Sequence, residues 1–132
     1  MDFLSIRIIT ADVARLVDFY ERATGVDADW STPDFAELRT ASATLAIAGT
    51  RTVPLFAPGS AEPAANRSVV LEFLVDDVDG AYRRLGADVP EFVTGPTTMP
   101  WGNRSLLFRD PDGNLVNFFT PVTETAKARF AR

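Results

Sequence analysis

Carboxylates would have to carry any acid–base chemistry in this chain, because its sequence contains neither histidine nor cysteine. Without histidine, the chain lacks the commonest general base and the commonest transition-metal ligand. Without cysteine, it has no disulfides, no thiolate ligands for zinc and no thiol nucleophile. A metal ion would therefore need oxygen ligands alone, a set that suits magnesium, calcium or manganese.

Arg7 and Glu72 are opposite charges that each stand inside an apolar run typical of a strand. They are 65 residues apart (72 − 7), the same offset that separates the Asp-Val pairs at 12–13 and 77–78. We interpret them as equivalent positions of a repeat. They could form an ion pair between the two repeats, or a polar floor that orients a ligand. Both can hold, because a paired arginine keeps spare N–H donors.

Apolar periodicity predicts the elements that position these residues, in the order βαβββ repeated twice. The first strand, 3–9, precedes a helix that Thr10 or Asp12 caps and Gly25 ends. The second helix is opened by Asp76 or Asp77 and closed by Gly86. The other expected strands lie at 27–31, 35–40, 43–48, 68–75, 91–95, 104–109 and 114–120. We also expect a short helix at 123–132, anchored by Phe130, and a loop or linker at 49–67.

Length and composition indicate one globular domain. The chain has 132 residues, of which 46% are hydrophobic and 23% charged, which is enough apolar material for a core. A net charge of −5 argues against a nucleic-acid partner, since phosphates favour basic surfaces. No apolar run is long enough to span a membrane and no leader is evident, so we expect a cytoplasmic protein with no membrane partner.

The segment 110–114, Asp-Pro-Asp-Gly-Asn, predicts a tight turn between two strands. Proline presets φ at the first turn position, while Gly113 and Asn114 tolerate positive φ. This hairpin, the Pro-Trp-Gly at 100–102 and the two strand–Asp-Val–helix units resemble the vicinal oxygen chelate superfamily. That superfamily includes glyoxalase I, extradiol dioxygenases and bleomycin-resistance proteins. The Pro-Trp-Gly segment and the turn are most similar to the metal-free, drug-binding bleomycin-resistance proteins.

The resemblance implies an α+β fold in which paired βαβββ modules form a curved mixed sheet with a concave ligand cavity. Residues 1–132 would make a single domain, with modules at about 1–49 and 68–122 joined by a loop at 50–67. Strand parity would then place Ser5, Arg7, Glu72, Asn117 and Phe119 toward the cavity. The family also implies a homodimer.

The same resemblance implies where a metal ion would bind, but this chain lacks the usual ligand residues at those positions. The family's enzymes bind a divalent ion at positions that correspond here to Ser5, Val70 and Asn117. Valine has no ligand atom in its side chain, and neutral serine and asparagine oxygens are weak partners for a divalent ion. We therefore expect no metal site, no cofactor and no catalytic residue of the usual kind.

The expected function is metal-independent binding of a small aromatic or hydrophobic molecule, with drug sequestration as its most concrete form. The candidate ligand-binding residues are Arg7, Glu72, Trp101, Asn117, Phe119 and Ser5. Trp101 is included because its indole could lie over the mouth of the cavity. Two alternatives stay open: a lyase or isomerase of the same superfamily with an atypical or absent metal, and a non-catalytic accessory dimer.

Overall fold

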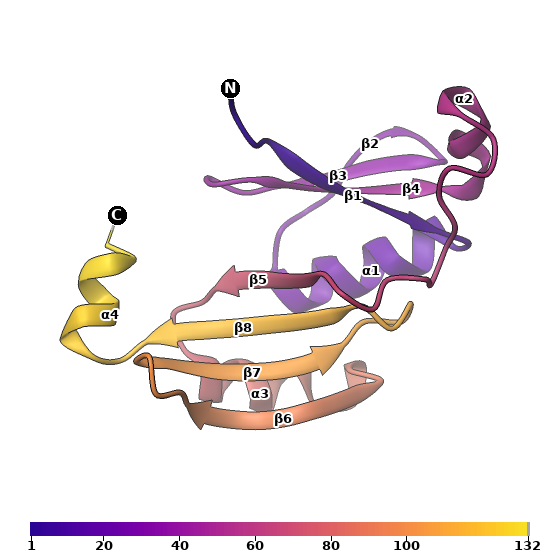
Figure 1. Ribbon diagram of the computed structural model, residues 1–132. Helices are drawn as coiled ribbons and strands as arrows, with labels where there is room; N and C mark the ends of the chain where they lie inside the picture. The colour runs from indigo at the N-terminus through magenta and orange to yellow at the C-terminus, as the bar shows by residue number, and fades with distance from the viewer. Residues whose placement is uncertain (132) are drawn as a thin grey trace. The chain divides into compact units, whose positions relative to one another are not determined.

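The computed structural model describes residues 1–131, which form two compact units divided after Asn66 (Figure 1). Each unit holds a four-stranded mixed sheet and one principal helix, and each is described by itself. The expected α+β class and the repeated βαβββ order are confirmed. The interpretation of the whole chain as a single domain stays a prediction.

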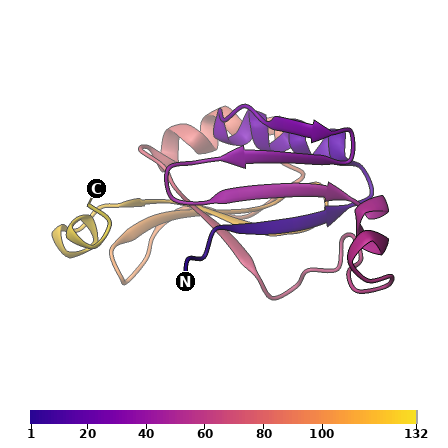
Figure 2. The ribbon, with the colours of Figure 1, turned by 90° about the horizontal axis from the view of Figure 1, so that it is seen from above.

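The first unit contains one sheet in the order β1-β4-β3-β2 (Figure 2). The strand pair β1/β4 is parallel, and the other neighbouring pairs are antiparallel. The elements are β1 (Ser5–Thr10), α1 (Val13–Thr24), β2 (Asp29–Thr32), β3 (Phe35–Arg39), β4 (Thr44–Gly49), a 3-10 turn η1 (Thr50–Thr52) and α2 (Val53–Phe56).

The second unit repeats this topology, with its sheet in the order β5-β8-β7-β6 and β5/β8 as the parallel pair. Its helix α3 contacts β6, β7 and β8, and so covers one face of the sheet. The elements are β5 (Val70–Leu74), α3 (Val78–Leu85), a 3-10 turn η2 (Gly86–Asp88), β6 (Glu91–Thr98), β7 (Asn103–Arg109), β8 (Leu115–Pro121) and α4 (Glu124–Arg129).

Equivalent aspartates begin the two principal helices. The Asp12 side chain accepts a hydrogen bond from the backbone N–H of Arg15 at 3.0 Å, and Asp77 accepts one from Gly80 at 3.1 Å. Each satisfies a donor that the first helical turn leaves unpaired. Of the two capping residues expected for α1, Asp12 is thus the cap. The buried residues of α1 fall at helical spacing and are Val13, Leu16, Val17, Phe19, Tyr20 and Ala23.

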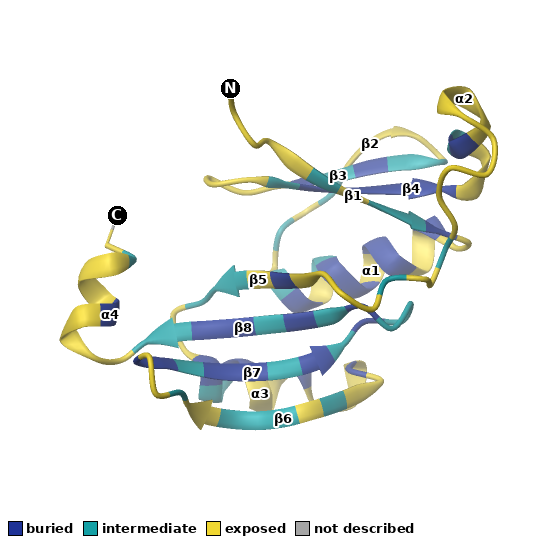
Figure 3. Ribbon diagram, in the orientation of Figure 1, coloured by how far each residue is buried: buried dark blue, intermediate teal, exposed yellow. Residues whose placement is uncertain are grey.

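Aromatic rings fill the core beneath α3. The rings of Phe108 and Phe118 are fully buried and meet edge to face with centroids 5.0 Å apart. Figure 3 shows buried segments alternating with less buried ones along β7 and β8, as the two-residue period of a strand requires. Side chains of the opposite parity, including Glu72 and Asn117, therefore lie on the face away from α3.

The Asp-Pro-Asp-Gly-Asn turn is held by a buried carboxylate. Asp110 Oδ1 accepts from the backbone N–H groups of Asp112 and Asn114, each at 2.9 Å, while Oδ2 accepts from Asn114 Nδ2 at 2.8 Å. Gly113 has a φ of +83°, as expected. Asn114 has no positive φ, and its contribution is the side-chain hydrogen bond instead.

The expectation of a loop over 49–67 was wrong for its first part, where η1 and α2 form. Thr52 Oγ1 donates to the Gly49 carbonyl at 2.8 Å, and Pro54 stands in the first turn of α2, where its missing N–H costs nothing. The expected strand at 91–95 also extends to Thr98 as β6, an edge strand whose irregular register accommodates Gly95 and Pro96.

The expected C-terminal helix forms as α4. Thr123 caps it by accepting from the backbone N–H of Ala126 at 3.2 Å. Phe130 follows the helix and packs edge to face on Phe119, with centroids 5.0 Å apart. Among the helices of residues 1–131, none is both long and apolar enough to cross a membrane.

Candidate functional site

Ser5 and Arg7 lie on the face of the first sheet away from α1. Both side chains are exposed on β1, whereas the alternating Ile6 and Ile8 are partly buried. The register pairs Ser5 with Thr44 and Arg7 with Ala46 of β4. The sequence-based assignment of these two residues to one face is thus supported by the strand pairing.

Aromatic rings accompany the Arg7 guanidinium. Its Cζ lies 5.1 Å from the centroid of the Phe35 ring and 4.9 Å from that of Phe56. These distances fall within the range of cation–π attraction. The sequence analysis missed the contact with Phe56, because that residue stood in a segment expected to be a loop. The signal that could have found it is the apolar Val-Pro-Leu-Phe at 53–56.

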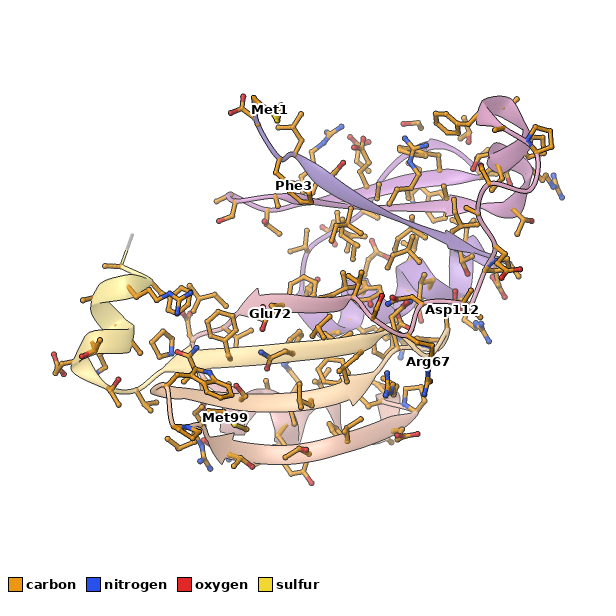
Figure 4. All side chains as sticks on the ribbon, in the orientation of Figure 1. Met1, Phe3, Arg67, Glu72, Met99 and Asp112 are labelled. Carbon is orange, nitrogen blue, oxygen red and sulfur yellow. The ribbon has the colours of Figure 1, made fainter. Side chains whose placement is uncertain are left out.

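Glu72 and Asn117 form the polar centre of the second sheet's face. They are partners across the parallel β5/β8 pair, and Asn117 Nδ2 donates to Glu72 Oε2 at 2.9 Å (Figure 4 labels Glu72). Asn117 Oδ1 is buried and has no hydrogen-bond partner among residues 1–131. A buried acceptor without a donor is costly, which makes this oxygen a candidate contact for a ligand.

Phe119 shares this face but is 8% exposed, because Phe130 packs on it. The Phe119 ring is therefore part of the contact between β8 and the end of α4. Its role as a ligand contact stays a prediction.

Trp101 stands in the turn between β6 and β7 and is 63% exposed. The turn is fixed beneath it, because the Gly102 N–H donates to the Met99 carbonyl at 2.9 Å and the Gly102 carbonyl accepts from Val122 N–H at 2.9 Å. Gly102 has a φ of +96°, a conformation that favours glycine. The indole thus projects from a hydrogen-bonded loop, and its contact with a ligand stays a prediction.

An ion pair between Arg7 and Glu72 that joins the two repeats was one of the two roles left open for these residues. The two residues belong to different units, so this ion pair also stays a prediction. Within the units, Arg7 meets two phenyl rings and Glu72 accepts from an asparagine amide.

Other ion pairs in the chain have structural roles. Arg104 donates through Nε and Nη2 to the two carboxylate oxygens of Asp79, at 2.8 and 3.0 Å, and so ties β7 to α3. These hydrogen bonds, more than the Coulomb attraction, lower the pKa of Asp79 below its usual 3.8. Arg39 donates to both Asp29 and Glu37, at 2.8 and 2.9 Å, and links the three residues along β2 and β3.

The residues at the family's metal-binding positions do not fit a divalent ion. Val70 offers no ligand atom, and the Asn117 Oδ1 atom is a neutral amide oxygen, a weak ligand for a divalent ion. Within residues 1–131, no group of three or more aspartate, glutamate, histidine or cysteine side chains is arranged to hold a metal ion. The donor chemistry on this face is one carboxylate, one amide and apolar neighbours.

The model of the Glyoxalase/Bleomycin resistance protein/Dioxygenase superfamily matches residues 3–118. The chain is 26% identical over 125 residues to the uncharacterized protein YraH of Bacillus subtilis, covering 90% of this chain and 98% of that protein.

Solved structures of this superfamily share the fold. A glyoxalase/bleomycin resistance protein/dioxygenase from Nocardioides is 25% identical, with a TM-score of 0.75 over 94% of this chain and 85% of that one. A family enzyme from Burkholderia phytofirmans PsJN has a TM-score of 0.81 over 92% of this chain and 100% of its own, and at 20% identity it shows the fold alone.

Proposed function

Because the chain belongs to the glyoxalase/bleomycin resistance protein/dioxygenase superfamily, we propose that it uses the superfamily's scaffold to bind a small aromatic or hydrophobic molecule without a metal ion. The observation that carries the proposal is the donor set at the family's metal positions, Ser5, Val70 and Asn117. A valine and two neutral side chains are a poor set for a divalent cation. Binding and sequestration need affinity but no catalytic group, so this donor set is compatible with them.

The faces described above support an aromatic or hydrophobic ligand. Each unit by itself offers aromatic surface: Phe35 and Phe56 in the first unit, and the exposed indole of Trp101 in the second, are rings that can stack on a flat molecule. Within the second unit, the Asn117 amide and the Glu72 carboxylate offer polar contacts to a ligand on their face of the sheet. Drug sequestration of the bleomycin-resistance type is the specific form we propose.

Metal titration tests the first half of the proposal. Purified protein is analysed for bound metal by mass spectrometry and then titrated with manganese, nickel and zinc by calorimetry. We expect no stoichiometric metal and no saturable binding. A positive control is the double variant Val70→His/Asn117→Glu, which together with Glu72 puts three ligating side chains on one face of the neighbouring strands β5 and β8 and is expected to bind zinc. One tightly bound metal per wild-type chain would overturn the proposal.

Tryptophan fluorescence tests the second half. A library of aromatic drugs is titrated into the wild type and into the matched variants Trp101→Phe and Trp30→Phe. We expect saturable quenching that Trp101→Phe removes and Trp30→Phe retains, with the drug recovered unchanged. Turnover of the bound molecule would favour an enzyme instead, and the absence of saturable quenching by any compound would contradict ligand binding.

A further inference from the structure

We propose that Arg7 is a receptor for an anionic group, and that the molecule bound by this protein is therefore an aromatic acid bearing a carboxylate, sulfonate or similar group. The inference rests on the proposed function, since it names the chemical class of that ligand.

The first observation is that the Arg7 guanidinium carries aromatic contacts but no acceptor within its unit. In residues 1–66, no carboxylate forms an ion pair with Arg7, and its guanidinium donates no hydrogen bond to a side chain or carbonyl. A guanidinium has five N–H donors at its edge, and ring contacts with Phe35 and Phe56 use none of them.

The second observation is that the acidic groups on the cross-strand row of Arg7 already accept hydrogen bonds from another arginine. Glu37 lies on the same cross-strand row as Arg7, separated from it by Ala46. Its carboxylate accepts from Arg39 Nη2 at 2.9 Å, and Asp29 accepts from Nη1 of the same arginine at 2.8 Å. One guanidinium balances only one of these two negative charges, but neither carboxylate forms an ion pair with Arg7, whose N–H donors remain available to an incoming anion.

The third observation is that small residues of β4, Ala46 and Ala48, form the sheet surface between Arg7 and its aromatic neighbours. Ala46 and Ala48 of β4 separate β1 from β3, and they are 3% and 0% exposed. Because methyl groups are short, the Arg7 side chain can extend across β4 to the Phe35 ring, whose register partner is Ala48. The guanidinium is therefore held against the sheet by packing, which reduces the entropy lost when an anion binds.

These features fit an acid joined to an aromatic ring. A planar guanidinium can bind a carboxylate or sulfonate through two parallel hydrogen bonds, and such charge-assisted bonds are stronger than neutral ones. Phe56 is 72% exposed, so its ring can contact the apolar part of the same molecule.

A pair of fluorescent probes that differ by one sulfonate tests the inference. The probes are 8-anilinonaphthalene-1-sulfonate and its neutral counterpart, N-phenyl-1-naphthylamine. Each is titrated into the folded wild type, Arg7→Met and Arg39→Met. Methionine keeps an apolar side chain of similar length beside the phenyl rings, and Arg39→Met removes an equal charge that is already paired. Circular dichroism and urea unfolding establish that the variants remain folded.

We expect Arg7→Met to weaken sulfonate binding by about tenfold, the scale of one charge-assisted hydrogen bond, and to leave the neutral probe unchanged. Arg39→Met should change neither affinity by more than about twofold, a screened surface charge effect. Equal affinity of Arg7→Met and wild type for the sulfonate, or equal weakening of both probes, would overturn the inference while leaving ligand binding intact. If neither probe nor any drug binds saturably to the wild type, the proposed function itself fails.

Discussion

Removing the Asp110 carboxylate should destabilise the second unit, because this side chain holds the closing turn together. The residue is 2% exposed and accepts three hydrogen bonds, from Asp112 N–H, Asn114 N–H and Asn114 Nδ2. Hydrogen bonds to a charged group contribute about 1.5 kcal/mol each at the lower end, so the three sum to about 4.5 kcal/mol. Some of the freed donors would reach water in this surface turn, and we therefore expect Asp110→Ala to cost about 3 kcal/mol.

Urea unfolding followed by circular dichroism measures this loss. With a slope of about 1.5 kcal/mol/M, a loss of about 3 kcal/mol lowers the midpoint by about 2 M. The matched control is Asp110→Asn, whose amide oxygen can still accept from both backbone donors while its NH₂ group faces the Asn114 amide. It should lose about half as much. A change below about 1 kcal/mol for Asp110→Ala, or equal losses for both variants, would refute the reasoning from hydrogen-bond geometry.

Two further predictions concern the turn before β7 and the Asp79–Arg104 ion pair that joins α3 to β7. Gly102→Ala should cost about 1–3 kcal/mol in urea unfolding, because φ is +96° and the new methyl would meet Thr123 Oγ1; an unchanged midpoint would contradict this. Hydrogen bonds from Arg104 lower the pKa of Asp79 below 3.8 in the folded protein. The stability that this ion pair contributes is therefore present above pH 3.8, and it is lost as the pH falls through the lower pKa of the folded state. When the pH is lowered from about 5 to about 2.5, the urea midpoint should therefore decrease less for Asp79→Asn than for the wild type. Equal decreases in the two proteins would contradict this role of the ion pair.

Much of the fold could be predicted from sequence because the relevant signals are local. The aspartate caps at 12 and 77 and the apolar residues at helical spacing depend on neighbours within a turn or two, so α1 and α3 form where the pattern placed them. The two-residue alternation likewise assigned Arg7 and Glu72 to faces of their sheets. The Asp-Pro-Asp-Gly-Asn turn was predicted by the conformational limits of its own residues.

The local signals were insufficient where a contact joins distant parts of the chain. Asn117 bonds Glu72 because the β5/β8 register sets them opposite each other, and that register depends on the packing of the whole sheet. Phe56 reaches Arg7 because α2 follows β4, a placement that a Gly- and Pro-rich segment did not reveal. Periodicity shows which face a side chain takes, but not which side chain lies beside it.

The sequence by itself therefore determined the repeated βαβββ order, the caps and the lack of histidine and cysteine ligands. Each of these depends on residue type or on neighbours in the chain. Only the tertiary structure decided that Arg7 lies among phenyl rings over an alanine floor, and that Asn117 is bound to Glu72 with one oxygen buried and unpartnered within residues 1–131. Those arrangements arise from strand register and side-chain packing, which bring together residues that are far apart in sequence.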